Sequence, residues 1–212
     1  MRKALVALVG RPNVGKSTLF NRLAGERLAV VDDVPGTTRD RLVAEVEWNG
    51  VSFDLVDTGG IEAAGRRADA WPLASHSAAF ISEIRAQSQL AINEADVVTF
   101  MTDASAGVTA TDTQVADMLR RAHKNVPGRK RPPLLLAVNK CDNASRRAYA
   151  QQFFELGLGE PYPIAALHGT GCGDLLDAIV AQLPATPSDT NNDAVPIAIV
   201  GRPNVGKSSL LN

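Results

Sequence analysis

Short apolar runs alternate with polar, glycine-containing segments along most of this chain. Several runs are continuous, which is typical of strands buried on both faces of a parallel sheet. Two others flank Asn49-Gly50, the strongest short hairpin signal, and are therefore predicted to pair in antiparallel fashion. The six predicted strands are 4–9, 42–48, 51–56, 97–101, 134–138 and 162–166.

Apolar residues at helical spacing lie between most of these strands. Leu19, Phe20 and Leu23 share one face of a predicted helix that Gly25 would end. Strands that alternate with helices predict an α/β fold. We expect a mostly parallel six-stranded sheet with one antiparallel strand and helices on both faces. The other predicted helices are 79–94, 111–123, 144–156 and 173–183.

Residues 10–17 follow the first predicted strand and have the form G-x-x-x-x-G-K-[ST]. This is a P-loop, in which backbone N–H groups surround phosphate oxygens and the next helix adds its positive N-terminal end. Lys16 would contact the outer phosphates, and Ser17 would offer its hydroxyl to Mg²⁺. The chain is therefore predicted to bind a nucleoside triphosphate within a P-loop NTPase fold. The predicted contacts are Gly10, Arg11, Pro12, Asn13, Val14, Gly15, Lys16, Ser17 and Thr18.

The charge and cysteine content of the chain limit the kinds of partner and site that it is expected to have. The 212 residues carry a formal net charge of −1, so no global field favours nucleic acid or a membrane surface. Cys141 and Cys172 lack metal-ligand spacing and are expected to pack as small side chains. No apolar run reaches the 18 or so residues that a membrane span needs. A cytoplasmic monomer without membrane contact is expected.

An acidic residue follows the hairpin directly, in Asp57-Thr58-Gly59-Gly60. Ligands of open α/β sheets bind at the carboxyl ends of the strands, so Asp57 is predicted to lie beside the P-loop. Asp57 would hold Mg²⁺ through a water, and Thr38 would donate its hydroxyl to the metal. Thr37 is the neighbouring alternative to Thr38. Gly60 is predicted to contact the nucleotide.

Asn139-Lys140-Cys141-Asp142 follows another predicted strand and indicates a guanine site. A carboxylate at Asp142 can accept hydrogen bonds from N1–H and the exocyclic amine of guanine. Adenine offers neither donor on that edge. Asn139 and the stem of Lys140 would support the base and the P-loop.

The C-terminal part of the chain repeats its beginning. Residues 184–194 are rich in linker-forming residues. Gly201 to Asn212 then repeat Gly10 to Asn21 with only two differences, which indicates duplication. The predicted organisation is a first GTPase domain at 1–184, a linker at 185–194 and the truncated start of a second domain at 195–212.

These motifs resemble the Era-like branch of the translation-factor-related GTPases. The two copies of GRPNVGKS, with PGTTRD and DTGG, are similar to the double-domain Der (EngA) family. The resemblance implies GTP hydrolysis to GDP in assembly of the large ribosomal subunit, with rRNA contacts made mainly through other domains. It also implies K⁺ assistance, with Asn13 holding the ion, and catalytic roles for Lys16, Asn13 and Thr38.

The sequence departs from that family's pattern at three places. Ile61 follows the D-x-x-G motif, where many GTPases have a glutamine that orients water. Ala165-Ala166 stands where the last guanine motif usually has Ser-Ala, although the Ala166 N–H would still reach the guanine oxygen. The segment 62–88 is longer than the resemblance leads us to expect for the second switch.

Three interpretations of function stay open. The first is a GTP-hydrolysing switch, and the second is a nucleotide-gated module that binds ribosome or RNA and hydrolyses negligibly in isolation. The third is a single-domain Era-like GTPase whose C-terminal repeat is incidental. The basic run within 120–131 fits either a solvated helix end or an RNA or partner contact.

Overall fold

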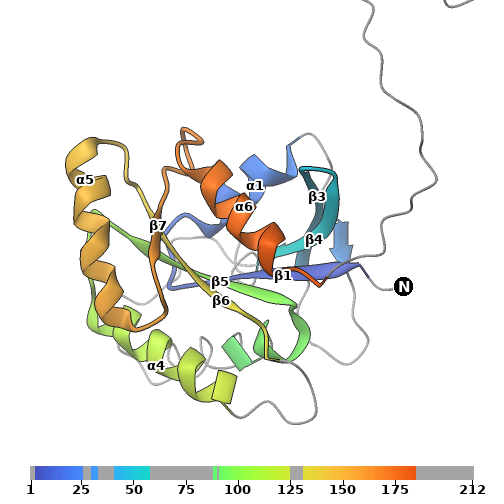
Figure 1. Ribbon diagram of the computed structural model, residues 1–212, viewed down its shortest axis with the longest axis horizontal. Coiled ribbons are helices and arrows are strands. Elements are labelled where there is room, and N and C mark those ends of the chain that lie inside the picture. Colours follow the sequence, from blue (N-terminus) through green and yellow to red (C-terminus); the bar gives the residue numbers. More distant parts are fainter. Residues whose placement is uncertain are drawn as a thin grey trace, which may run out of the picture.

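A mixed sheet runs through the part of the chain that the computed structural model describes, residues 3–25, 30–32, 41–57, 88–89, 91–124 and 131–184. Its strands are β1 (Ala4–Val9), β2 (Val30–Asp32), β3 (Arg41–Trp48), β4 (Val51–Asp57), β5 (Val97–Asp103), β6 (Leu134–Asn139) and β7 (Pro161–Pro163). They lie in the order β2-β3-β4-β1-β5-β6-β7 (Figure 1).

Strand direction follows the expected pattern. β1 pairs in parallel with β4 and β5, and β5, β6 and β7 continue the parallel arrangement. β3 alone runs in the opposite direction, antiparallel to both β2 and β4. The prediction of a mostly parallel sheet with one antiparallel strand is confirmed. The predicted count of six was low by one, because β2 has only three residues and is too short to show a periodicity.

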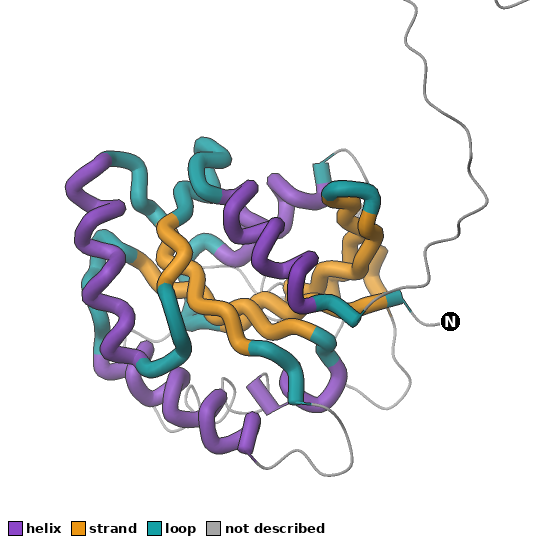
Figure 2. The backbone as a smooth tube through the Cα atoms, viewed as in Figure 1, coloured by secondary structure: helices purple, strands orange, loops and turns teal. Residues whose placement is uncertain are grey.

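Helices cover both faces of this sheet (Figure 2). On one face, α1 (Lys16–Ala24) and α6 (Cys172–Gln182) bury Leu19, Phe20 and Leu175 in one cluster. On the other face, α4 (Ala110–Lys124) and the 3₁₀ helix η2 (Ala150–Leu156) contribute Leu119 and Phe153 to a second cluster. The short α5 (Ala144–Tyr149) precedes η2. The predicted two-sided cover is confirmed.

Element boundaries differ from the predictions in two places. The predicted helix 144–156 changes from α to 3₁₀ at Ala150. The last strand ends at Pro163 rather than at 166, because Ala165 turns out of the ladder to donate to the Thr170 carbonyl over 2.8 Å. Of the predicted helix 79–94, only residues 88–89 and 91–94 are described, and these are helical.

The hairpin between β3 and β4 forms at Asn49-Gly50 as predicted. Both residues have positive φ, 49° and 76°, which a tight hairpin turn of this kind requires. The Trp48 indole and the Asn49 amide donate to Asp177 Oδ1 of α6 over 2.7 and 3.0 Å. The hairpin is thereby tied to the helix layer.

Several predicted features lie outside the described residues. They are Thr37, Thr38, Gly60, Ile61, most of the segment 62–88, residues 125–130 of the basic run, and everything from 185 to 212. Within the described ranges, none of the helices combines the length and apolar character needed to cross a bilayer.

The stability that the Trp48–Asp177 hydrogen bond adds by joining the hairpin to α6 can be measured. Asp177→Ala removes the acceptor and should lower the free energy of unfolding by about 1 kcal/mol. Trp48→Phe removes the indole donor but keeps an aromatic ring, so the double variant should lose less than the sum of the two single losses. Urea unfolding would measure all three, and additive losses would show that the indole and the carboxylate do not stabilise each other.

Candidate nucleotide-binding site

The parallel strands bring the predicted motifs to one edge of the sheet. The P-loop follows β1, Asp57 ends β4, Asp103 ends β5 and Asn139 ends β6. The strand register places Leu8 opposite Asp57 and Asp103 opposite Asn139. Because these strands share a direction, their carboxyl ends form one continuous rim, as the sequence predicted.

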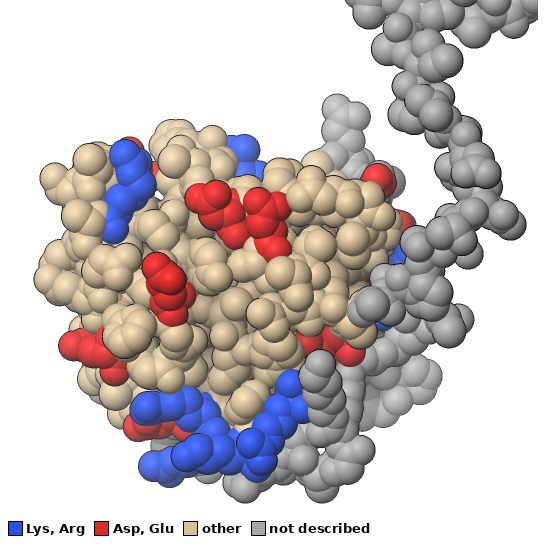
Figure 3. Space-filling model, in the orientation of Figure 1, with Lys and Arg blue, Asp and Glu red and all other residues tan. Residues whose placement is uncertain are grey.

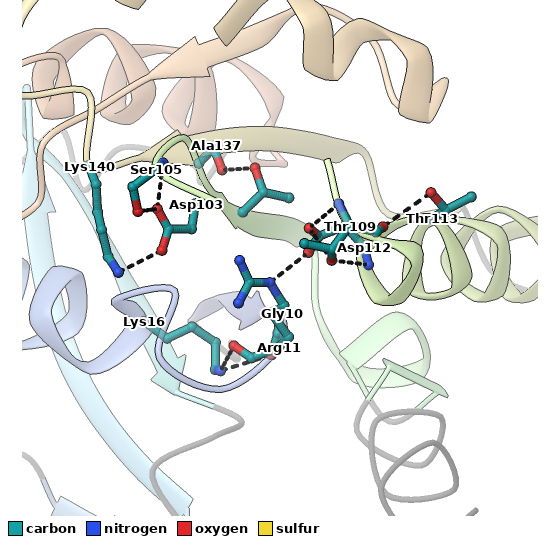
Figure 4. A network of polar contacts seen from close by, with 11 residues as sticks. Gly10, Arg11, Lys16, Asp103, Ser105, Thr109, Asp112, Thr113, Ala137 and Lys140 are labelled. Carbon is teal, nitrogen blue, oxygen red and sulfur yellow. Dashed lines mark hydrogen bonds and ion pairs between the residues drawn. The ribbon is translucent and has the colours of Figure 1, made fainter. Parts of the chain in front are cut away.

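The P-loop curls around the ammonium group of Lys16. Lys16 Nζ donates to the carbonyl oxygens of Gly10 and Arg11 over 2.8 and 3.0 Å (Figure 4). Its side chain comes from the first turn of α1, and the residue is only 7% exposed. A buried cation inside a ring of backbone groups is suited to an anion with several oxygens, such as a polyphosphate.

Close packing explains the second glycine of the P-loop. Gly15 has φ 97°, and a Cβ built there would lie 2.2 Å from Asn139 Nδ2. Any side chain would therefore push Asn139 away from the loop. Glycine is therefore required here by the close approach of Asn139, which belongs to the predicted base-reading motif.

Ser17 and Asp57 meet as the metal-site prediction requires. Ser17 Oγ donates to Asp57 Oδ2 over 2.7 Å, and Asp57 is fully buried. Mg²⁺ prefers one or two protein oxygens together with substrate phosphates, so this pair beside the P-loop fits the ion. No group of three or more His, Cys, Asp or Glu that could hold a metal occurs among the described residues. A separate all-protein metal cage is therefore not found in that part of the chain.

The side chain of Asn139 joins two loops. Its Nδ2 donates to the Val14 carbonyl over 2.8 Å, and its Oδ1 accepts from the Ala166 N–H over 2.9 Å. Asn139 therefore supports the P-loop as the sequence led us to expect. The Ala166 N–H that was expected to reach a guanine oxygen is already donated to Asn139. Contact with the base would require that bond to be shared or exchanged.

Lys140 contacts a residue that the sequence did not single out. Its Nζ donates to Asp103 Oδ2 over 2.6 Å, and Asp103 Oδ1 accepts from the Ser105 N–H and hydroxyl (Figure 4). Burial would raise the pKa of Asp103. This effect of burial is outweighed by the hydrogen bonds from Lys140 and Ser105 and by the charge of Lys140. Together they hold the pKa of Asp103 below its ordinary value. The contact fastens the loop after β6, which is predicted to read the base, to the end of β5.

Asp142 lies at the rim with partners of its own. Arg146 Nη1 donates to Asp142 Oδ2 over 2.9 Å, and His168 Nε2 lies 3.9 Å from Asp142 Oδ1. The Asp142 side chain is 38% exposed, so a base approaching from solvent would find an accessible carboxylate. Arg146 contacts one oxygen of that carboxylate and does not cover the carboxylate.

A second contact that the sequence analysis missed joins the P-loop to α4. Arg11 Nε donates to Asp112 Oδ1 over 3.2 Å, and Asp112 is fully buried (Figure 4). Asp112 also exchanges hydrogen bonds with Thr109 in a capping box. The spacing Thr109-x-x-Asp112 is a sequence signal for the capping box, but it does not indicate the contact with Arg11.

Both cysteines are free and buried, so the expectation that they pack as small side chains is confirmed. Burial raises the pKa of Cys141 to about 11. This thiol stays protonated near neutral pH and is unsuited to nucleophilic attack.

Comparisons with known proteins agree with this geometry. The sequence profile of the family described as "50S ribosome-binding GTPase" matches residues 5–140 and 196–212. The chain belongs to that family. The resemblance to the Der (EngA) GTPases that the motifs indicated is confirmed by this match together with relatives named GTPase Der.

Individual relatives support the same placement. GTPase Der from Limosilactobacillus reuteri is 48% identical over 212 residues, which are 100% of this chain and 44% of that protein. GTPase Der from Geobacillus kaustophilus is 49% identical over 213 residues, with the same coverage. The chain thus spans less than half the length of these relatives.

Solved structures show the same fold. Aquifex aeolicus Era bound to GDP and aluminium fluoride has a TM-score of 0.59 and 30% identity, over 87% of this chain and 58% of that one. The cytosolic domain of T. maritima FeoB has a TM-score of 0.57 and 24% identity, over 85% of this chain and 63% of that one. The fold class predicted from the sequence, a P-loop G domain, is confirmed.

Acid should weaken the fold through Asp103. Its pKa is lower in the folded chain than in the unfolded chain, so its contribution to stability is complete above about pH 4 and is lost as the pH falls through the lowered value. The urea midpoint of the unmodified chain should therefore fall more between about pH 5 and pH 3 than that of Asp103→Asn, which cannot titrate. Equal falls would contradict this role for Asp103.

Proposed function

We propose that this chain is a Mg²⁺-dependent GTPase that binds GTP at the rim of β1, β4, β5 and β6 and hydrolyses it to GDP and phosphate. The observation that carries the proposal is the Asn139 amide, which joins the P-loop at Val14 to the loop at Ala166. A phosphate cradle and a base-reading loop held by one side chain are suited to a ligand with both a polyphosphate and a purine. The family match supports guanine as that purine.

Each site residue has a distinct role in this proposal. Lys16 and the P-loop N–H groups bind the phosphates and stabilise the charge that develops on them during transfer. Ser17, Asp57 and Thr38 would hold Mg²⁺, which supplies positive charge between the outer phosphates. Asp142 would accept from N1–H and the exocyclic amine of guanine.

Asn13 is the proposed K⁺ ligand. It lies in the P-loop with φ 63° and is exposed. Its amide oxygen is therefore accessible to a cation beside the phosphates, and that ion would add positive charge where an arginine acts in other GTPases.

The biological setting is also part of the proposal. We propose action in the cytoplasm, as a monomer, during assembly of the large ribosomal subunit. The family description, a 50S ribosome-binding GTPase, supports the large subunit. The match at 196–212 supports a second domain of the same kind, beginning after a linker at 185–194.

One observation favours the alternative of a nucleotide-gated RNA-binding module. Lys and Arg side chains gather along the lower edge of the face in Figure 3, where Figure 1 places α4. The last turn of α4 contains Arg121, His123 and Lys124. A cationic helix end could contact RNA phosphates, and it is also electrostatically favourable without a partner.

Turnover in K⁺ and Na⁺ separates these possibilities. GTP hydrolysis should be at least about tenfold faster in K⁺ than in Na⁺ at equal ionic strength, because a fitted cation stabilises transition-state charge. Asn13→Ala should remove the difference between the two salts. Lys16→Ala should abolish GTP binding and serves as the control for contaminating activity.

The outcomes of that assay are distinct. Equal turnover in the two salts would contradict the K⁺ role. GTP binding without turnover in either salt would favour the RNA-binding module.

Base selection is tested at Asp142. Asp142→Asn should weaken GTP binding by about a hundredfold or more and favour xanthosine triphosphate, because the new amide donates where xanthine accepts. Asp174→Asn, an exposed aspartate on α6, is the matched control and should leave both affinities unchanged. Unchanged GTP affinity in Asp142→Asn would show that this carboxylate does not read the base.

A further inference from the structure

The guanidinium group of Arg22 donates hydrogen bonds to the loop that follows β7. Arg22 lies in the last turn of α1, and its Nε donates to the Ala166 carbonyl while its Nη2 donates to the Leu167 carbonyl. The first of these contacts joins residues 144 positions apart in the sequence. A planar guanidinium can donate in two directions at once, which a lysine ammonium does with less geometric control.

These contacts close a ring through the nucleotide site. The P-loop continues directly into α1, which carries Arg22. Arg22 bonds to Ala166, whose N–H donates to Asn139 Oδ1 over 2.9 Å, and Asn139 Nδ2 returns to Val14 of the P-loop over 2.8 Å. The phosphate cradle and the loop at 166–167 are therefore connected on two sides.

Little else holds the tip of this loop. The Leu167 side chain is 67% exposed and contributes no buried packing. The neighbouring bonds, Gly169 N–H and His168 N–H to the Ala165 carbonyl, are internal to the loop. Gly169 packs against the arginine, since a Cβ there would lie 3.0 Å from Arg22 Nη1.

Because a peptide unit is planar, the hydrogen bond from Arg22 to the Ala166 carbonyl also fixes the direction of the Leu167 N–H. The Ala166 carbonyl and the Leu167 N–H belong to one peptide unit, and no described peptide bond is cis. In a trans peptide the C=O and N–H point in opposite directions. Binding of the Ala166 carbonyl by Arg22 therefore turns the Leu167 N–H away from α1. No described residue accepts a hydrogen bond from that N–H.

We propose that Arg22 is a positioning residue for base recognition, which holds the 166–167 peptide so that the Leu167 N–H faces the O6 oxygen of guanine. This inference rests on the proposed GTP function. It assigns the O6 contact to a loop N–H that is not already bonded to Asn139. It also gives α1, which begins at the phosphates, a direct part in reading the base.

The test compares two ligands that differ at positions 1 and 6 of the purine. GTP has an O6 acceptor and an N1–H donor, whereas 2-aminopurine riboside triphosphate keeps the sugar, phosphates and exocyclic amine but lacks both O6 and the N1–H. Its missing N1–H weakens binding equally in every variant, so the comparison uses the change in each ligand's affinity on substitution of Arg22. In Arg22→Met, which keeps the aliphatic stem, GTP should bind about five- to twentyfold more weakly, because a charge-assisted grip on the loop is lost. The affinity of the 2-aminopurine ligand should change by less than about twofold.

Two further variants control the comparison. Lys3→Met removes an exposed cation that pairs with Glu45, immediately before β1 and away from the rim, and should leave both affinities unchanged. Arg22→Lys supplies one point donor and should recover part of the GTP affinity. It also keeps the test available if Arg22→Met does not fold, with a smaller loss for GTP and again none for the 2-aminopurine ligand.

Two results would contradict the proposed role of Arg22. Equal losses for both ligands would show that Arg22 only stabilises the fold around the site, and no loss for GTP would show that the grip is irrelevant to binding; either overturns the inference. If the unmodified chain binds GTP, the proposed function stands whatever these variants do. If it binds neither ligand, the proposed function fails and the inference falls with it.

Discussion

The proposed nucleotide site depends on one buried carboxamide. Asn139 is 3% exposed and uses both ends of its side chain, with the nitrogen donating to Val14 and the oxygen accepting from Ala166. A carboxylate could not donate to the Val14 carbonyl, and a hydroxyl could not span the two loops. Because a buried polar group without a partner is costly, the two loops are held in one relative position.

The parallel sheet makes this bridge possible. Segments separated by more than a hundred residues reach the same rim because β1, β4, β5 and β6 run in one direction. Further polar contacts then fix the loops between neighbouring strands. Arg11 connects the P-loop to α4, and Lys140 connects the base-reading loop to the end of β5. The loops that we propose bind the phosphates and the base are thereby parts of one polar network, and the core clusters on the two faces of the sheet pack beneath it.

Local patterns in the sequence predicted most of the fold. Gly10 to Ser17 and the Asn49-Gly50 turn carry their geometry in adjacent residues, so the strand–loop–helix and hairpin assignments were correct. β2 was missed because three residues show no period. The change to a 3₁₀ helix at Ala150 left no recognisable pattern in the sequence.

The candidate site was predicted less completely than the fold. Motif spacing located Lys16, Ser17, Asp57 and Asn139, and the structure brings them to one rim. The contacts of Arg22, Arg11 and Lys140 could not be predicted, because each joins residues that only the folded topology brings together. Thr38 and Gly60 lie outside the described residues, and their roles stay predictions.

The central claim is that one polar network recognises both the phosphates and the guanine base of the nucleotide. Equilibrium titration of the unmodified chain with GTP and with ATP, in Mg²⁺ and monitored by calorimetry, tests it most directly. We expect saturable GTP binding and ATP binding weaker by at least about a hundredfold, because adenine offers no donor on that edge to the Asp142 carboxylate. ATP binding as tight as GTP binding would contradict it.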